Sequence, residues 1–327
     1  MERILIIGGY GHVGSKIARR LIAAGRAVTV AGRDGAKARA EAAKLGCEGA
    51  AFDLARPASW GALEAADVVI CCLDTPDASL ARAVLERGAR YLDISATDAV
   101  LRRIEGLDAF TAEKDTLALL SVGLAPGLTN LMVREARTRR PDASGFRIGV
   151  LLGLGDEHGP AAIDWTLRTL VPLSRADIRP MRFGADRRAQ PTIPFDFADQ
   201  HALTRRGYPR VETRLALGSP LMAGWVLRLL SRMAQRPGLR AFLARTMPLL
   251  RVGSDRTALV VEALGAPALR LTLEGRQEAE VTAQIAAEVA LRITGLEARG
   301  VRHLDEVLTL DALSGALAGQ GVRLGGD

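Results

Sequence analysis

The feature that most constrains this chain is a glycine-rich segment near its start, Gly8–Gly14, with the sequence GGYGHVG. An apolar run, Ile4–Ile7, leads directly into it, and apolar residues at helical spacing follow it until Gly25. A second β-favouring run, Ala27–Ala31, comes next. A strand, a glycine turn and a helix form the context in which a Gly-x-Gly-x-x-Gly pattern binds a dinucleotide. We therefore favour a dinucleotide site over an ordinary βαβ turn.

Three glycines occupy the places that this motif requires. Gly9 permits the tight turn, Gly11 lets the backbone approach a pyrophosphate, and Gly14 lets the helix pack closely on the strand. The amide groups at the start of the helix then face the phosphates, aided by the positive end of the helix dipole. Tyr10, His12 and Val13 lie within the same turn, and we place His12 near the pyrophosphate.

The end of the second strand indicates which cofactor binds. An acidic residue there would hold a ribose 2′-hydroxyl, whereas a basic residue accommodates a 2′-phosphate. The chain has Arg33 at this place and Lys37 one turn further on. Arg33 can pair with the phosphate and stack on the adenine, so we expect NADP rather than NAD. Asp34 is expected to cap the next helix. The alternative for Arg33 is an ordinary solvated arginine.

Strands alternate with helices through the first 125 residues, which predicts an open parallel sheet of the doubly wound, Rossmann type. Ligands of such sheets bind at the carboxyl ends of the strands. Asp53 ends one strand and could accept from the adenine amino group, although it could instead cap the helix that contains Pro57. Leu73 and Asp74 end the next strand, Asp93 ends the fifth, and Gly123–Gly127 follows the sixth. We expect strands at Arg3–Ile7, Ala27–Ala31, Gly49–Phe52, Asp67–Leu73, Arg90–Ile94 and Thr116–Val122, and helices at Asp77–Arg87 and Asp98–Glu113.

The pattern changes after residue 125 to an α+β domain with a mostly antiparallel or mixed sheet, to which we assign substrate binding and dimerisation. The expected domains are residues 1–125, 126–295 and a C-terminal segment, 296–327, whose amphipathic helix Leu304–Leu317 returns to the nucleotide domain. Arg182–Tyr208 is expected to be a loop. The other expected strands are Phe146–Leu152, Val211–Leu217, Leu259–Leu264 and Leu269–Leu273, and the helices are Leu128–Arg139, Ala161–Val171, Leu221–Ala234 and Glu278–Ile293.

Composition narrows the class of protein further. The net charge is +7, but the basic residues are dispersed and few aromatics lie between them, so we expect no nucleic-acid partner. The cysteines, Cys47, Cys71 and Cys72, have neither metal nor disulfide spacing. Without a signal peptide or an apolar run of about 20 residues, the chain is expected to be cytoplasmic.

The basic amphipathic stretch Leu221–Leu250 has two interpretations. It could lie on a membrane, but we favour packing on a sheet or on a second subunit, and hence a homodimer without a membrane partner.

With the glycine turn in place, three further segments carry a family resemblance: Ala31–Asp34 (AGRD), Tyr91–Ser95 (YLDIS) and Gly123–Leu128 (GLAPGL). The chain resembles the saccharopine dehydrogenase-like NAD(P)-dependent oxidoreductases, well over its first half and more loosely over its second, through Gly253–Arg256 and the Glu278–Ile293 helix. The resemblance implies that the Gly123–Gly127 turn runs beside the nicotinamide and that hydride passes to or from a carbon–nitrogen bond of an amino-acid-derived amine or imine.

Such a reaction needs a positioned acid or base and cations that hold a substrate carboxylate. His158 titrates in the useful range and is one candidate proton carrier; the alternative is a structural histidine. Asp93 is the other candidate, with a backbone-bonding or cofactor-orienting carboxylate as its alternative. We assign Arg256 and Glu157 to substrate binding, whereas His201 and His303 have no partner pattern and are expected to be structural.

The residues assigned to NADP(H) are Gly9, Tyr10, Gly11, His12, Val13, Gly14, Arg33, Asp34, Asp53, Leu73, Asp74, Gly123, Pro126 and Gly127. Two other functions stay open: an NADPH-dependent reductase of another C=O or C=C bond, and a redox sensor that binds NADP without turnover.

Overall fold

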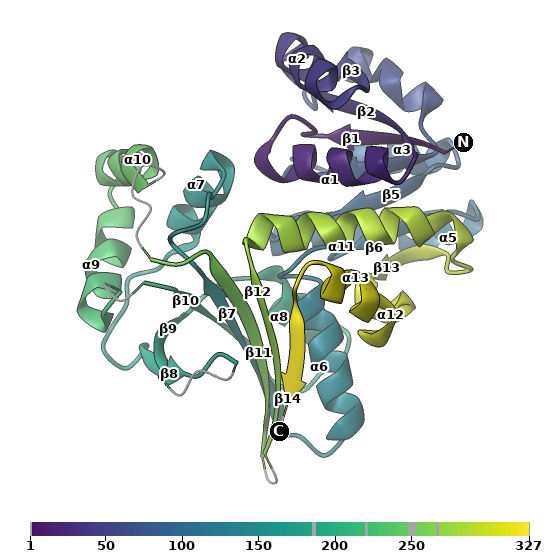
Figure 1. Cartoon of the computed structure of the whole chain (residues 1–327). Coiled ribbons are helices and arrows are strands. Elements are labelled where there is room, and N and C mark those ends of the chain that lie inside the picture. The colour runs from purple at the N-terminus through teal and green to yellow at the C-terminus, as the bar shows by residue number, and fades with distance from the viewer. Residues whose placement is uncertain (1, 185–187, 220–221, 248–252, 266–267, 327) are drawn as a thin grey trace. The chain divides into compact units, whose positions relative to one another are not determined.

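The computed structural model describes residues 2–184, 188–219, 222–247, 253–265 and 268–326 (Figure 1). The chain forms two compact units. The first comprises Met1–Leu131 and Thr282–Ala316, and the second comprises Met132–Val281 and Leu317–Asp327. The chain passes from the first unit to the second within helix α6 (Leu128–Arg139), and it returns to the first unit within helix α11 (Glu278–Arg292).

The first unit is built on a seven-stranded, entirely parallel sheet in the order β13-β6-β5-β4-β1-β2-β3. The expected Rossmann-type fold is thereby confirmed. Its strands are β1 (Arg3–Ile7), β2 (Ala27–Gly32), β3 (Glu48–Ala51), β4 (Val68–Cys71), β5 (Arg90–Asp93), β6 (Leu117–Leu120) and β13 (Gly300–His303). Its helices are α1 (His12–Ala23), α2 (Gly35–Leu45), η1 (Pro57–Ala65), α3 (Ser79–Glu86), α4 (Asp98–Glu105), α5 (Asp108–Glu113), η3 (Ile293–Gly295), α12 (Leu304–Val307) and η4 (Asp311–Leu313).

The short central strands form the core of this unit. Every residue of β4 (VVIC) and β6 (LALL) is buried, as expected for strands covered on both faces. On one side of the sheet α11 lies beside α1, where Arg20 Nε donates to Gln284 Oε1 at 2.9 Å (Figure 1). Helices from both ends of the chain therefore cover the same sheet.

Two expectations about this unit were wrong. The single helix expected at Asp98–Glu113 is divided into α4 and α5 around Gly106, a residue type with low helix propensity. The strand β13 was missed, because its four residues, GVRH, lack a strand-like apolar run. It pairs in parallel with β6 at the edge of the sheet.

A buried histidine fixes the end of β13. His303 is 3% exposed; its Nδ1 lies 2.8 Å from Ser121 Oγ and its Nε2 lies 3.0 Å from Glu105 Oε1. Its backbone N donates to Glu306 Oε2 at 2.7 Å. The side chain thus joins β6, α4 and β13, a structural role.

The second unit is built on a seven-stranded mixed sheet in the order β14-β12-β11-β7-β10-β9-β8, in which β7 and β10 are parallel and the other pairs are antiparallel. The expected α+β architecture is confirmed. Its strands are β7 (Gly145–Leu152), β8 (Arg179–Met181), β9 (Gln190–Pro194), β10 (Val211–Leu217), β11 (Arg256–Leu264), β12 (Leu269–Arg276) and β14 (Arg323–Gly326). Its helices are α7 (Pro160–Thr169), α8 (Ala198–Arg205), α9 (Gly224–Ala234) and α10 (Pro237–Thr246), and α13 (Ser314–Gly319) spans the boundary.

Segments of the second half also differ from expectation, and the short strands β8 and β14 were not expected. Arg182–Tyr208 is not simply a loop, because it contains β9 and α8; residues 185–187 lie outside the described ranges. The single helix expected at Leu304–Leu317 is interrupted, because Leu308 is extended and Thr309 Oγ1 accepts from Ala312 N to begin a new turn. In the described part of the chain, no helix has the length and apolarity needed to span a bilayer.

Candidate functional site

The glycine turn is closed by backbone hydrogen bonds. The amides of Gly8 and Gly9 both donate to Ala31 O, at 2.8 and 3.1 Å, and Gly11 N donates to Gly8 O at 2.9 Å. The turn therefore joins the end of β1 to the end of β2, at the carboxyl edge of the sheet, and α1 starts immediately after it at His12.

Each of the three motif glycines is required by its surroundings. A Cβ on Gly14 would lie 2.3 Å from Gly8 O, one on Gly9 would lie 2.8 Å from Val30 Cβ, and one on Gly11 would lie 3.0 Å from Gly8 O. A backbone this close admits no side chain, which leaves the concave side of the turn free for a diphosphate. The first amide groups of α1, including those of His12 and Val13, have no acceptor within the helix and are available to an anion.

Tyr10 connects the turn to the end of β2. Its hydroxyl accepts from Asp34 N at 3.3 Å, and its ring lies so close to Gly32 that a Cβ there would meet Tyr10 Cε1 at 2.5 Å. The Asp34 side chain accepts from the amides of Ala36 and Lys37, at 3.0 and 3.1 Å, as the expected cap of α2. Arg33, between these fixed neighbours, is exposed at the carboxyl edge of the sheet.

Asp53 has local partners. Its Oδ1 accepts from Ala55 N at 3.1 Å and its Oδ2 lies 3.6 Å from Arg56 Nε. These contacts stabilise the turn before η1, close to the alternative role in which Asp53 caps that helix. A contact of Asp53 with adenine stays a prediction.

The loop after β4 lies against the glycine turn. A Cβ on Gly8 would meet the Leu73 side chain at 3.1 Å, and Leu73 itself is 37% exposed. The next residue, Asp74, accepts from Ser95 Oγ at 2.5 Å and from Thr97 Oγ1 at 2.6 Å. The carboxyl ends of β4 and β5 are therefore joined by a polar network beside the turn.

Asp93 lies under this network and has no exposed surface. Its Oδ1 accepts from Ser95 N at 2.8 Å and its Oδ2 accepts from Tyr91 Oη at 2.7 Å. Burial, opposed by these hydrogen bonds, raises the pKa of Asp93 to about 7. The hydrogen bond from Ser95 N matches the alternative in which Asp93 binds backbone amides. Direct proton transfer by Asp93 stays a prediction.

The turn after β6 also depends on a glycine. Gly127 has a φ of 141°, and a Cβ on it would lie 2.0 Å from Gly123 O. Gly123 N donates to Pro126 O at 3.1 Å, so the turn closes on itself before α6 begins. Asn130 Oδ1 accepts from Gly127 N at 3.3 Å, while its buried Nδ2 has no partner among the described residues.

In the second unit, His158 lies between two acceptors. Its Nε2 lies 3.0 Å from Gly153 O and its Nδ1 lies 3.5 Å from Glu278 Oε2. The hydrogen bond and charge of Glu278 raise the pKa of His158, against the effect of burial. Asp156 Oδ2 accepts from Glu278 N at 2.9 Å, so the loop after β7 holds the start of α11. Glu157, between Asp156 and His158, is exposed.

Arg256 begins β11 in the same unit and is already paired. Its Nη2 donates to Glu274 Oε2 at 2.8 Å and to Phe183 O at 2.6 Å. Its side chain is 27% exposed. A substrate carboxylate would have to bind there in addition to Glu274 or in its place.

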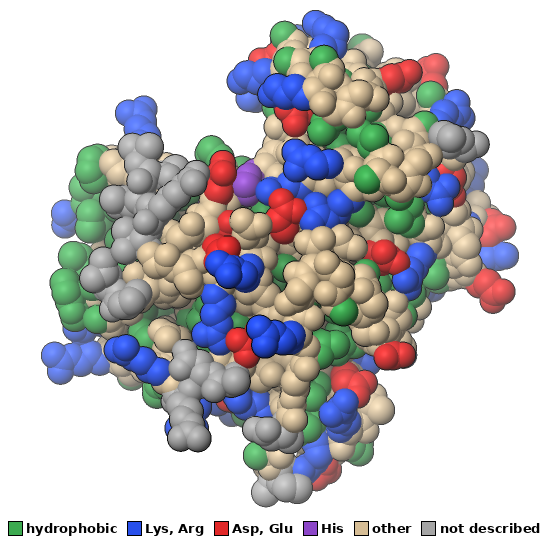
Figure 2. Space-filling view, in the orientation of Figure 1, with side chains coloured by type: hydrophobic (Ala, Val, Ile, Leu, Met, Phe, Trp, Pro, Cys, Tyr) green, Lys and Arg blue, Asp and Glu red, His purple; other side chains and the backbone are tan. Residues whose placement is uncertain are grey.

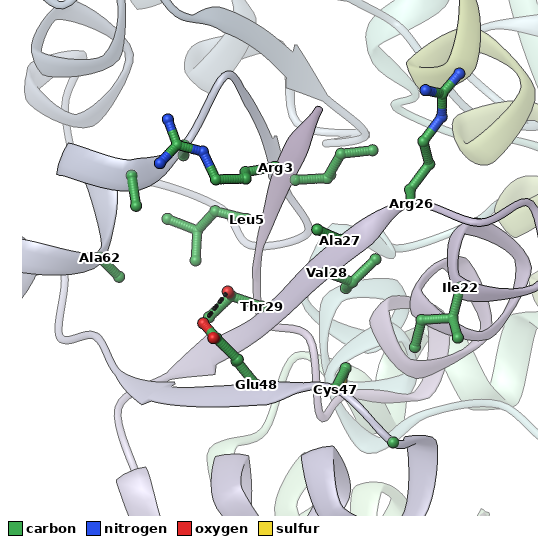
Figure 3. Close-up of a pocket in the computed structure, with 14 residues that line it drawn as sticks. Arg3, Leu5, Ile22, Arg26, Ala27, Val28, Thr29, Cys47, Glu48 and Ala62 are labelled. Carbon is green, nitrogen blue, oxygen red and sulfur yellow. Dashed lines mark hydrogen bonds between the residues drawn. The ribbon is translucent and has the colours of Figure 1, made fainter. Parts of the chain in front are cut away.

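One cavity of about 360 Å³ lies at the amino edge of the first sheet, away from the glycine turn (Figure 3). Arg3, Arg26 and Cys47 line it, and Thr29 Oγ1 donates to Glu48 Oε2 at 3.3 Å beside it (Figure 3). Since dinucleotides bind at the carboxyl edge, this cavity is not the cofactor site. Among the residues that the structure describes, no group of three His, Cys, Asp or Glu side chains could hold a metal ion.

Several polar residues of these networks were not assigned from the sequence. Tyr91, Ser95 and Glu278 lie in segments that carried the family resemblance but were given no role of their own, and Thr97 and Asn130 were not singled out. Their position at the carboxyl ends of parallel strands was the one available signal for Ser95 and Thr97. The contacts of Tyr91, Asn130 and Glu278 depend on packing between residues that the sequence pattern does not reveal.

The parallel sheet, the glycine turn and the basic residue after β2 define an NAD(P)-binding protein of the Rossmann type. Residues 4–121 match the family described as "Saccharopine dehydrogenase NADP binding domain". This match confirms the resemblance to the saccharopine dehydrogenase-like oxidoreductases over the nucleotide-binding part of the chain. NADP(H) is the cofactor of this domain.

The whole chain has the fold of a solved saccharopine dehydrogenase. The apo, histidine-tagged, L-Glu-forming enzyme from Saccharomyces cerevisiae is 14% identical, with a TM-score of 0.68 over 100% of this chain and 99% of that chain. A probable dehydrogenase from Thermotoga maritima is 11% identical, with a TM-score of 0.47 over 90% and 89% of the two chains. The search of curated proteins gave no significant match. The domain and the fold together support an oxidoreductase of the dehydrogenase type.

Proposed function

We propose that this protein is an NADP-dependent oxidoreductase that transfers hydride to or from a carbon–nitrogen bond of an amino-acid-derived imine or amine. The match of residues 4–121 to a saccharopine dehydrogenase NADP-binding domain carries this proposal. The name of the yeast enzyme of the same fold, a saccharopine dehydrogenase, favours amino-acid chemistry. When bound, NADP(H) supplies or accepts the hydride.

The residues at the carboxyl edge of the first sheet fit this cofactor. The glycine turn would hold the diphosphate, and Leu73 and Asp74, next to the turn, would border the bound dinucleotide. The closed turn formed by Gly123, Pro126 and Gly127 is proposed to lie beside the nicotinamide. Adenine would lie near Asp53.

Arg33 is proposed to select NADP by pairing with its 2′-phosphate. Its neighbours Gly32 and Asp34 are fixed by Tyr10 and by the cap of α2, while Arg33 itself is exposed. An Arg33→Asp variant would place a carboxylate where a phosphate should bind, so we expect weaker NADPH binding and a relative gain for NADH.

The matched control is Arg87→Asp, which makes the same charge change just after α3, at the amino edge of the same sheet. Titration of NADPH and NADH by fluorescence compares the two variants. Unchanged NADPH affinity in Arg33→Asp would refute the cofactor assignment.

Three side chains are proposed to serve the substrate, and a fourth is proposed to support the site. Arg256 would hold a carboxylate, with Glu157 as a further contact. His158, whose raised pKa favours the protonated form, would donate the proton that the substrate nitrogen needs in the reductive direction. Asp93, enclosed beneath Ser95, is proposed to orient its neighbours.

The roles of the domains, the charge of the substrate, the oligomeric state and the cellular compartment are also proposals. Residues 1–125 would bind the nucleotide, and residues 126–295 would serve substrate binding and dimerisation. Of the C-terminal segment 296–327, the part up to Ala316 would complete the nucleotide domain, whereas β14 belongs to the second sheet. The substrate would be a small molecule carrying a carboxylate, and the protein would be a cytoplasmic homodimer.

The test is NADPH oxidation with a panel of 2-keto acids, each combined with amines including the ε-amino group of lysine. Turnover that requires both the keto acid and the amine would support the proposed chemistry. Turnover with a carbonyl or enoyl compound alone would favour the other class of reductase. Tight NADPH binding without turnover of any compound would favour a redox sensor.

A further inference from the structure

The helices α9 and α10 carry an unusual combination of charge and apolar surface. The sequence from residue 213 to residue 254 contains no Asp or Glu, whereas the two helices and the two residues between them contain Arg228, Arg232, Arg236, Arg240 and Arg245. Arg232, Arg236 and Arg245 are exposed. This part of the chain therefore presents cations without neighbouring carboxylates in sequence.

Large apolar side chains lie exposed on the same helices. Trp225 is 64% exposed, Leu229 is 50% exposed and Phe242 is 58% exposed. Val171, just after α7, is 56% exposed. These four are most of the six large apolar side chains that are exposed in the described part of the chain. Figure 2 shows hydrophobic side chains along the margin of the molecule that α9 and α10 form in Figure 1.

Helical periodicity explains how one helix presents both kinds of residue. In α9 the buried residues Leu227, Ser231 and Ala234 recur at spacings of three and four, and they form the inner side of the helix. Trp225, Leu229 and Arg232 also recur at these spacings, on the outer side. The inner side of α9 packs with α7 and α10 around Ile163, Leu167, Ala234 and Leu243. Because that cluster is already formed, the exposed side chains are not needed to complete it.

We propose that this surface, defined by Trp225, Leu229, Arg232, Phe242 and Arg245, docks the protein on an anionic lipid bilayer. Exposed tryptophan, leucine and phenylalanine between arginines are typical of helices that lie in the headgroup region. Tryptophan favours that interface, and each arginine near it is attracted by anionic headgroups. This inference is independent of the proposed catalytic activity.

Charge argues against a second copy of the chain as the occupant. In a two-fold dimer through this surface, Arg232 and Arg245 of both copies would be brought together, and neither α9 nor α10 carries a carboxylate to pair with them. Like charges in a desolvated interface oppose association. An anionic bilayer has the complementary charge and also accommodates the apolar side chains.

The experiment uses the full chain and vesicles of phosphatidylcholine with or without phosphatidylglycerol. We expect cosedimentation with the anionic vesicles at about 0.1 M salt and release at about 1 M, where the Debye length falls to about 3 Å. We also expect the fluorescence of the wild-type protein, but not of Trp225→Phe, to shift to shorter wavelength on the anionic vesicles.

Two double variants separate the contributions. Arg232→Glu with Arg245→Glu, and Trp225→Ala with Phe242→Ala, should each weaken binding to anionic vesicles at least about tenfold. The matched control, Arg87→Glu with Arg102→Glu, changes two exposed arginines of the first unit and should bind like the wild type. Circular dichroism checks that each variant is folded.

Three results would overturn the proposal: no binding to anionic vesicles, equal binding to pure phosphatidylcholine, or equal loss of binding in the control. A dimer in sedimentation velocity that dissociates in Trp225→Ala with Phe242→Ala would also overturn it, by identifying a second copy as the occupant.

Discussion

The hydroxyl of Tyr91 donates to Asp93 Oδ2 at 2.7 Å, and neither side chain has any exposed surface. Burial raises the pKa of Asp93 to about 7, from a value of 3.8 in the unfolded chain. Between these two values the folded protein binds more protons than the unfolded chain, so stability should fall as the pH rises through this range. Three pKa units correspond to a free-energy change on the order of 4 kcal/mol.

Asp93→Asn cannot ionise, so it should abolish most of this decline. Urea unfolding of both proteins at pH 5 and at pH 8 measures the difference. Glu113→Gln, at an exposed position of the same unit, is the control and should keep the wild-type pH dependence. Parallel pH profiles for Asp93→Asn and the wild type would show that this carboxyl is ionised in the folded protein at both pH values.

Gly14→Ala should impair the glycine turn, because the new Cβ would lie 2.3 Å from Gly8 O. Moving this backbone should cost about 1–3 kcal/mol of stability and weaken NADPH binding. Gly61→Ala, where a Cβ meets nothing within 4 Å, is the matched control. Calorimetry with and without NADPH separates the two effects, and an unchanged ligand-induced rise in Tm for Gly14→Ala would contradict the expectation.

Glu278→Gln should lower the pKa of His158. Glu278 is the largest cause of the raised pKa, so the wild-type contact stabilises the fold at pH values below the unfolded pKa of about 6.5. This contribution is lost as the pH rises through the higher pKa of the folded state. NMR titration of the histidine ring protons measures the change; the chain has 4 histidines, and His158→Gln identifies the relevant signal. A His158 pKa that is equal in the two proteins would exclude the contact in solution.

His303→Ala should destabilise the protein by about 2–4 kcal/mol, because it leaves the buried Ser121 hydroxyl without this partner and removes a bond to Glu105. His201→Ala is the control: its side chain is 43% exposed and pairs with Asp196, so the change should cost less than about 0.5 kcal/mol. Denaturant unfolding compares them. Similar losses in both variants would show that the buried contacts of His303 contribute little.

The nucleotide half was predictable because its signals are local. A buried parallel strand is a short apolar run, and a diphosphate turn requires glycines at fixed spacing, so β1 and β2 were found within about a residue and the helix α1 was expected between them. The cap formed by Asp34 was predicted for the same reason. In the second unit, β7 and β10 were found equally well from their β-favouring runs, whereas β8, β9 and β14 were not expected.

Features that depend on distant residues were not predictable in this way. The strand β13 is apolar at few positions and is held by pairing with β6, far away in sequence. The contact of His158 with Glu278 joins residues 120 positions apart in the sequence. The ion pair of Arg256 with Glu274 forms between two neighbouring strands. The sequence could identify these side chains as titratable or cationic. It could not show that other residues of the protein already form ion pairs or hydrogen bonds with them.

The chain finishes both sheets late: β13 is the edge strand of one and β14 is the edge strand of the other, and both come from the last 30 residues of the sequence. During translation, the outer edges of β6 and β12 stay unpaired until β13 and β14 have been synthesised. A nascent chain that ends before residue 300 therefore exposes two unpaired strand edges at once, the kind of surface through which incomplete chains aggregate.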